Sequence, residues 1–345
     1  MNETRKIEIQ NNLTNKGVKE GVKYNNAELL SVLLEYQNAL SESVFTKLHA
    51  EHLAAKDVLL HFRCLAEEYG LEQSEEFLRF DANMSKLQRT IRALINGNKG
   101  EREAAEALRL ITLDKGVEVL SNIEIQDGND CTEYDEIVIS PNGIFVIEVK
   151  NYKNPMKLTK EGNLVRQDGV QHGPKYNLGV KMNKKEFLLR KLLAEKLEEV
   201  GLDIPIYYNG IILFTNNESN LIDEYNQIPI CYCSTISQYI RSQNCDTEPL
   251  TTEQIVTLKR IIRELHTPLK YTCEFSCEEI TNDFAHLMAV IEEAADNRDS
   301  VAKPYSGSED GPSEKNSIRK NVAKYVVAAS LVATIMARLA LKGRA

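Results

Sequence analysis

The run from Pro141 to Lys150 constrains the fold most, because an apolar segment ends in a glutamate and a lysine two residues apart. On a β-strand, successive side chains point to opposite faces, so Ile147 and Val149 share one face while Glu148 and Lys150 share the other. Burying such charges is costly unless they serve a metal or a substrate. The run therefore predicts a strand that carries part of a functional site.

The preceding segment, 134–139, is a second strand candidate and supplies Asp135. If residues 142–143 form a two-residue hairpin loop, Asp135 lies opposite Lys150 and diagonal to Glu148, with all three on one face. A loop one residue longer, with a bulge, would slip the register by one and send Glu148 to the other face. We expect the two-residue loop and a cluster of two carboxylates and one ammonium.

These residues resemble the nuclease-related domain, a branch of the PD-(D/E)xK nuclease superfamily. The resemblance covers about residues 98 to 268 and rests on Asp135, the Asn142-Gly143 turn, the strand 144–150 with the Asn151-Tyr152 that follows, and the upstream Gly100-Glu101, Ala104 and Leu108. It implies an α/β fold with a mixed sheet flanked by helices. It also implies an active site that contains Glu101, Asp135, Glu148 and Lys150. The family often has a glutamine on the helix after the core strands, where this chain has Lys181.

Two carboxylates on adjacent strands, together with a backbone carbonyl, form an oxygen-rich site for a hard cation. We expect Asp135, Glu148 and the carbonyl of Val149 to hold Mg²⁺ or Mn²⁺, with Glu101 completing the shell directly or through water. The metal would polarise a phosphate and lower the pKa of a bound water, while Lys150 would position that water or stabilise the transition state. The alternative is a surface hairpin with a cross-strand Asp–Lys pair and a solvated glutamate.

The chain is acidic overall, with a net charge of −9, but its basic residues are unevenly placed. From residue 150 to residue 191, eleven lysines and arginines stand against three acids, which gives this segment a net charge of +8. A positive face beside the predicted site would hold a phosphate backbone. We expect Lys153, Lys181, Lys184 and Lys185 to bind nucleic acid, and DNA in particular. The alternative is a solvated, lysine-rich helix.

The seven cysteines predict reduced thiols in a cytoplasmic protein, because residues 1–25 are polar and lack the apolar core of a secretory signal. Cys231 and Cys233 share a strand face, and Cys273 and Cys277 lie four residues apart. These are not the spacings of a standard zinc knuckle, so we expect ordinary, partly buried thiols.

The N-terminal part predicts helices. We expect a flexible N-terminus in residues 1–25 and an antiparallel helical hairpin or coiled coil in 26–97, packing on itself, on a second copy of the chain or on a partner protein. The apolar positions repeat at seven-residue spacing in Leu48, Ala55, Phe62 and Tyr69, and at alternating spacings of three and four in Phe77, Phe80, Met84, Leu87, Ile91 and Leu94. The stretch 96–100 is expected to end this helical unit.

The nuclease-like segment is expected to span residues 98–270. The patterns predict helices at 101–113, 181–199 and 252–266, strands at 117–125, 134–140, 144–150, 207–215 and 228–233, and a small hairpin around Gly162. Thr251 and Gln254 form a capping box for the last of these helices. An accessory helix, capped by Ser276 and Glu279, is expected in 271–295.

The C-terminal part turns polar in residues 296–317, which we expect to be a disordered linker. The tail, 318–345, contains a mostly apolar run flanked by lysine and arginine, and predicts a helix. A membrane anchor is one interpretation, although the run is short for a bilayer span. An interfacial or partner-binding helix is the other, because a polar residue recurs at every fourth position.

Two functions follow from these observations. The first is a metal-dependent nuclease that hydrolyses phosphodiester bonds of DNA. The alternative is a catalytically weak or inactive adaptor that keeps the nuclease fold and binds nucleic acid or a membrane-associated partner. The intact Asp135, Glu148 and Lys150 favour the nuclease, whereas Lys181 in place of glutamine favours the adaptor.

Overall fold

The computed structural model describes residues 3–45, 57–128, 130–168, 177–216, 220–244, 248–268, 270 and 272–301. The chain divides into two compact units, one formed by residues 93–270 and the other by residues 1–92 with those that follow residue 270. The helices are α1 (Glu3–Leu13), α2 (Asn26–Phe45), α3 (Val58–Glu68), α4 (Glu75–Arg109), α5 (Leu178–Glu199), α6 (Ile236–Ser242), α7 (Thr252–Leu265) and α8 (Cys277–Val301), with a short 3-10 helix, η2 (Ile111–Leu113). The strands are β1 (Glu118–Asp127), β2 (Asp130–Ser140), β3 (Gly143–Lys150), β4 (Met156–Leu158), β5 (Leu164–Arg166), β6 (Tyr208–Phe214), β7 (Leu221–Asp223) and β8 (Ile230–Tyr232).

The unit of residues 93–270 is built on a mixed five-stranded sheet in the order β1-β2-β3-β6-β8. The strands β1, β2 and β3 are antiparallel neighbours, whereas β3, β6 and β8 run parallel. A parallel neighbour requires a crossover, which α5 provides between β3 and β6. The predicted fold class, a mixed sheet flanked by helices, is confirmed for this unit.

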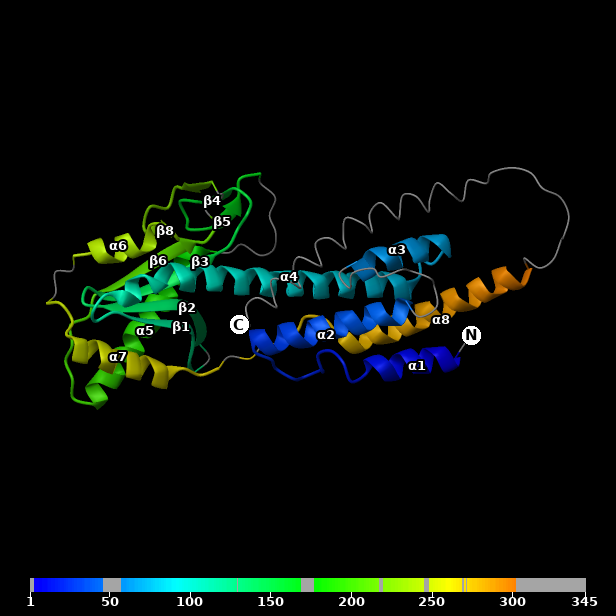
Figure 1. Ribbon diagram of the computed structural model, residues 1–345, viewed down its shortest axis with the longest axis horizontal. Helices are drawn as coiled ribbons and strands as arrows, with labels where there is room; N and C mark the ends of the chain where they lie inside the picture. Colours follow the sequence, from blue (N-terminus) through cyan, green and yellow to red (C-terminus); the bar gives the residue numbers. More distant parts are fainter. Residues whose placement is uncertain are drawn as a thin grey trace. The chain divides into compact units, whose positions relative to one another are not determined.

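Helices cover both faces of the sheet (Figure 1). The helices α5 and α7 pack on one face, where Leu189 and Leu258 join the larger core, and α4 and α6 pack on the other, where Leu108 and Ile236 join a second core. The predicted capping box of α7 is present, because Thr251 accepts a hydrogen bond from the backbone of Gln254 and the Gln254 side chain accepts one in return. With helices on both sides, the inner strands are buried along most of their length.

A second, three-stranded sheet has the order β5-β4-β7. The turn between β4 and β5 contains Gly162 at φ +80°, so the predicted hairpin around this glycine is confirmed. The strand β7 and the helix α6 were not predicted. Each is too short, at three and seven residues, for an apolar period to be visible in the sequence.

The helix α4 passes without a break through residues 96–100, where the sequence predicted the end of a helix. Two glycines inside a helix cost about 1 kcal/mol each relative to alanine, which is why the stretch predicts a stop. Packing explains why the helix continues. A Cβ atom at Gly100 would lie 2.9 Å from Cβ of Asn151, so the glycine lets α4 approach the end of β3 closely.

The other unit contains α1, α2, α3, the first part of α4, and α8. Its core includes a cluster of three aromatic rings, Phe62, Phe80 and Phe284, in which Phe62 lies 4.8 Å from each of the other two by ring centroid. The predicted seam of α4 is buried from Phe77 to Ile91. This seam packs among several helices of the unit, so the predicted two-helix hairpin accounts for only part of the packing. Leu48 and Ala55 lie outside the described residues.

Both ends of the described chain differ from expectation. Residues 3–13 form α1, with Ile9 and Leu13 buried and Arg5 paired with Glu292 of α8, so the prediction of a flexible N-terminus is wrong for this stretch. The helix α8 continues to Val301, six residues into the predicted linker. The predicted tail helix, 318–345, lies outside the described residues. Within the described ranges, no helix is long and apolar enough to span a membrane.

Candidate functional site

The hairpin of β2 and β3 has a register that differs from the predicted one. Ser140 pairs with Gly143, so the two-residue loop is 141–142 instead of 142–143, and Asp135 comes to the level of Glu148. Gly143 is the first residue of β3, and only glycine fits there, because a Cβ atom would lie 2.4 Å from the backbone oxygen of Tyr207. The shift amounts to two residues. Because side chains alternate with a period of two, it leaves the predicted shared face unchanged.

Asp135 sits at an irregular point of β2. The pairing of β1 with β2 skips Asp135 and its opposite residue Asn122, which has a positive φ of 52°. The Asp135 side chain turns toward β3, where its Oδ2 accepts a hydrogen bond of 2.6 Å from the backbone nitrogen of Val149. The carboxylate thus replaces a backbone acceptor and joins the two strands at the site.

Glu148 is the centre of the site and is only 1% exposed. Its Oε1 accepts hydrogen bonds from the ammonium groups of Lys150 and Lys181, and its Oε2 accepts one from Lys185. Burial alone would raise the pKa of Glu148, but Lys150, Lys185 and Lys181 outweigh it and lower that pKa well below its usual value. Glu148 is therefore a carboxylate held by three cations.

Lys185 is fully buried, so the prediction that it contacts nucleic acid as a surface lysine is wrong. Its Nζ lies 3.6 Å from Oδ1 of Asp135 and 5.6 Å from the ring centre of Tyr134, besides its bond to Glu148. The Tyr134 hydroxyl donates a hydrogen bond of 2.9 Å to the carbonyl of Lys185. A signal was present in the sequence, because Lys185 continues the buried row of Leu178, Met182 and Leu189 along α5.

Further carboxylates gather around Asp135. Glu101 lies on α4, and its side chain forms a hydrogen bond with the side chain of Asn122. Burial and the charge of Asp135 raise the pKa of Glu101. Burial, Asp135 and Glu101 raise the pKa of Glu133 to about 7. Glu136, which accepts a hydrogen bond from Ser121, has a pKa raised to about 7, chiefly by burial. The sequence analysis did not select Glu133 or Glu136, because their proximity to Glu101 depends on the packing of α4.

The four residues that the resemblance placed in one active site thus come together. Lys150 contacts Glu148, Lys185 links Glu148 to Asp135, and Glu101 is close enough to Asp135 for the Asp135 charge to raise its pKa. The site lies at the end of β3 where the strand leaves the sheet.

The predicted metal ligands do not offer free oxygens in this arrangement. Both oxygens of Glu148 accept from lysines, the carbonyl of Val149 accepts from Lys150 at 3.2 Å, and Oδ1 of Asp135 faces Lys185. Among the residues that the structure describes, no three His, Cys, Asp or Glu side chains are grouped so as to hold a metal ion, the cysteines included. As arranged, the donor set does not fit a divalent cation.

The basic segment is partly neutralised by acids. Lys184 pairs with Asp130, Lys191 with Asp127, and Lys157 with Glu224. These acids lie outside residues 150–191, so the net charge of +8 overstates the positive face. Lys153 is exposed just beyond β3, and the side chain of Lys181 is 36% exposed at the site.

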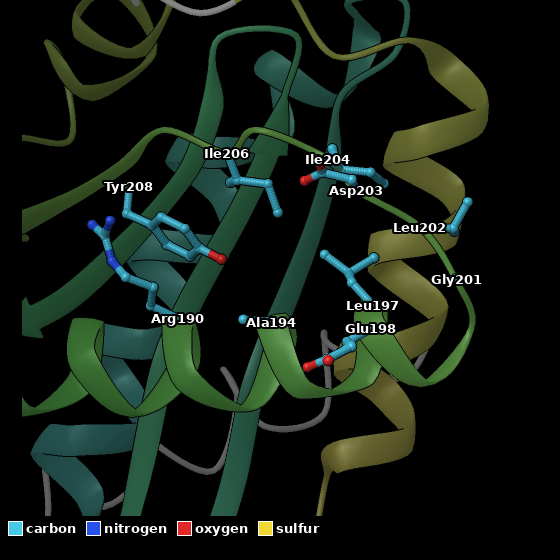
Figure 2. A pocket seen from close by; sticks show the side chains of 10 residues that line it. All are labelled: Arg190, Ala194, Leu197, Glu198, Gly201, Leu202, Asp203, Ile204, Ile206 and Tyr208. Atoms are coloured by element: carbon cyan, nitrogen blue, oxygen red, sulfur yellow. The ribbon is translucent and has the colours of Figure 1, made fainter.

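A pocket of about 510 Å³ lies elsewhere in this unit, between the end of α5 and the start of β6 (Figure 2). The ring of Tyr208 lines it, with the Arg190 guanidinium 4.5 Å from the ring centre. Tyr208 pairs with Ile144, whereas Lys150 pairs with Phe214, so pocket and site are about 20 Å apart along the strands. The pocket is therefore separate from the carboxylate–lysine site.

Residues 96–215 match the family model of the nuclease-related domain. The chain contains a nuclease-related domain. The matched range includes Glu101, Asp135, Glu148, Lys150 and Lys185, and it ends one residue after β6. The resemblance identified in the sequence is confirmed, and it suggests a nuclease-like fold. Comparison with curated proteins and with solved structures gives no match.

Proposed function

We propose that the nuclease-related domain hydrolyses phosphodiester bonds of DNA at the site around Glu148. One observation carries the proposal: the ammonium groups of Lys150 and Lys181 converge on the same oxygen of Glu148 while their side chains stay 13% and 36% exposed. Cations held in this way are positioned before substrate arrives, and they can stabilise the charge that develops on phosphoryl oxygens during attack by water.

The residues at the site supply groups for each part of the reaction. A water oxygen bonds to phosphorus as the bond from phosphorus to the leaving oxygen breaks. Asp135, whose side chain is 17% exposed, accepts the proton of the water, and Lys150 donates a proton to the leaving oxygen. Glu148 holds Lys150 and Lys181 in place.

Binding of Mg²⁺ or Mn²⁺ by Asp135, Glu148 and the carbonyl of Val149 stays a prediction from the resemblance. It would require Lys150 and Lys181 to release Glu148, so no step of the proposed reaction is assigned to a metal. Nucleic-acid contacts by Lys153, Lys181 and Lys184 are likewise proposed, and Lys184 would first have to exchange Asp130 for a phosphate.

The test is a cleavage assay with the full-length protein on labelled single-stranded DNA, duplex DNA and RNA, each in EDTA, Mg²⁺ and Mn²⁺. We expect cleavage of DNA by the wild type and by Lys196→Ala, which removes an exposed lysine of α5 that pairs with Glu199 away from the site. Asp135→Asn should abolish cleavage. If no substrate is cleaved under any condition, the proposal fails.

A second function is favoured by the way Glu148 is engaged. A carboxylate whose oxygens all accept from lysines is suited to a structural role, and the domain would then bind nucleic acid without cleaving it. The same samples separate the two functions. Binding of DNA that weakens with salt, without cleavage, would support the adaptor, because phosphate contacts release counterions.

A further inference from the structure

The ammonium of Lys185 lies between the two carboxylates that were expected to bind a metal. It donates to Oε2 of Glu148 and lies 3.6 Å from Oδ1 of Asp135. A divalent ion shared by these two carboxylates would need the same space. The ammonium therefore supplies, from within the chain, a positive charge at the position where a cation would bridge β2 and β3.

Several contacts fix Lys185 in this position. Its side chain is completely buried on the face of α5 that packs against the sheet, among Leu178, Met182 and Leu189. The Tyr134 hydroxyl bonds to its backbone carbonyl, and the Tyr134 ring lies 5.6 Å from its Nζ. A buried, enclosed lysine cannot swing into solvent as an exposed one can. Displacing it would leave an ammonium unpaired in the core, which is strongly unfavourable.

The other oxygen of Glu148 is also engaged, by Lys150 and Lys181. These two side chains reach solvent, so they can exchange Glu148 for another anion, whereas Lys185 cannot. A divalent cation that approached Asp135 and Glu148 would therefore meet one cation that is fixed and two that are mobile. When substrate binds, Lys150 and Lys181 can move to its phosphate, but Lys185 stays between Asp135 and Glu148 and still repels a divalent cation.

We propose that Lys185 takes the place of the bridging metal ion, so that the native site excludes divalent cations and binds the anionic substrate with lysines alone. Lys185 is then a positioning residue, because it acts through Glu148 and Asp135. The inference rests on the proposed function for its choice of site, but its test uses no nucleic acid. A protein that fails to cleave DNA would still give a result.

The experiment is a titration of the full-length protein with Mn²⁺, followed by electron paramagnetic resonance of the free ion and by calorimetry. Lys185→Met removes the ammonium and keeps a long apolar side chain. We expect it to bind one Mn²⁺ at least about tenfold more tightly than the wild type, and we expect added Asp135→Asn to remove this gain. Lys196→Met, which breaks an exposed pair on the same helix, should bind like the wild type.

Two results would overturn the proposal. One is a Lys185→Met protein that is folded by circular dichroism and binds Mn²⁺ no better than the wild type. The other is wild-type protein that binds Mn²⁺ about tenfold more tightly than its Asp135→Asn variant, which would place the ion at the site despite Lys185. This second comparison decides the matter if Lys185→Met does not fold, and equal affinities in it support the proposal.

Discussion

Lys185 and Glu148 form a hydrogen-bonded ion pair in which neither side chain reaches solvent, with 0% and 1% exposed. A buried pair of this kind adds little net stability compared with apolar residues of the same size, but breaking it is costly because one charge stays behind unpaired. Net stability is therefore a poor explanation for the pair, which agrees with the proposed role of Lys185 and Glu148 at the site.

Glu148→Gln should destabilise the unit of residues 93–270 by about 3–5 kcal/mol, because it leaves the buried ammonium of Lys185 with only the carboxylate of Asp135, 3.6 Å away. Urea denaturation followed by circular dichroism measures the change. Glu199→Gln is the matched control, since it removes an exposed carboxylate that pairs with Lys196, and it should cost less than about 1 kcal/mol. Equal small losses in the two variants would show that the buried pair does not have the expected energetics.

Glu136→Gln should make the protein more stable above neutral pH. The pKa of Glu136 is about 7 in the folded chain, against an ordinary value of 4.5. Between these values the folded state binds more protons than the unfolded state, so stability falls as pH rises through this window. The variant avoids that loss and should gain about 3 kcal/mol at pH 8, with the gain shrinking toward pH 4. A difference that does not vary with pH would contradict the expectation.

Gly100→Ala and Gly97→Ala should have opposite effects although both glycines lie inside α4. A Cβ atom at Gly97 has its nearest neighbour, the end of the Glu101 side chain, at 3.8 Å, so the variant should gain up to about 1 kcal/mol from helix propensity. A Cβ atom at Gly100 would lie 2.9 Å from Cβ of Asn151 and should cost about 1–3 kcal/mol. Chemical denaturation measures both. A gain at Gly100 would show that α4 does not pack closely on the end of β3.

The helix α1 should contribute to the stability of its unit. Ile9→Ala removes a side chain that is 1% exposed and should cost about 2–5 kcal/mol. Ile7→Ala, in the same helix, changes a side chain that is 52% exposed and should stay within about 0.5 kcal/mol. Thermal denaturation compares the two. Equal changes in stability for the two variants would indicate that residues 3–13 are flexible, as the sequence predicted.

The sequence predicted those elements whose pattern is long and local. The helix α7 has a capping box and an apolar stripe within one stretch of chain, and β3 is an unbroken apolar run. The predicted hairpin register was wrong because β3 begins at Gly143, where the backbone oxygen of Tyr207, a residue more than sixty positions away, leaves room only for a glycine. The break predicted at residues 96–100 failed for the same reason, since Asn151 is what requires a glycine in α4.

The sequence predicted several of the residues that form the site, but only part of how they contact one another. Asp135, Glu148 and Lys150 could be selected from two strands because the period of two is robust to a register shift of two. Lys185 was visible as a lysine within an apolar row of α5, but its charge suggested a surface position. The raised pKa values of Glu133 and Glu136 depend on the burial of their side chains and on Glu101, which arrives from α4, and no spacing along the chain predicts them.

The most direct test of the proposed reaction is the single-turnover rate at which Lys150→Ala cleaves DNA, compared with wild type and with Lys196→Ala. If Lys150 stabilises the transition state and protonates the leaving oxygen, its loss should slow cleavage by roughly 100-fold or more, while Lys196→Ala should keep the wild-type rate. Removing one group that stabilises the transition state typically lowers the rate by about 100-fold. A folded Lys150→Ala protein that cleaves DNA within about threefold of the wild-type rate would therefore contradict the proposed role of Lys150.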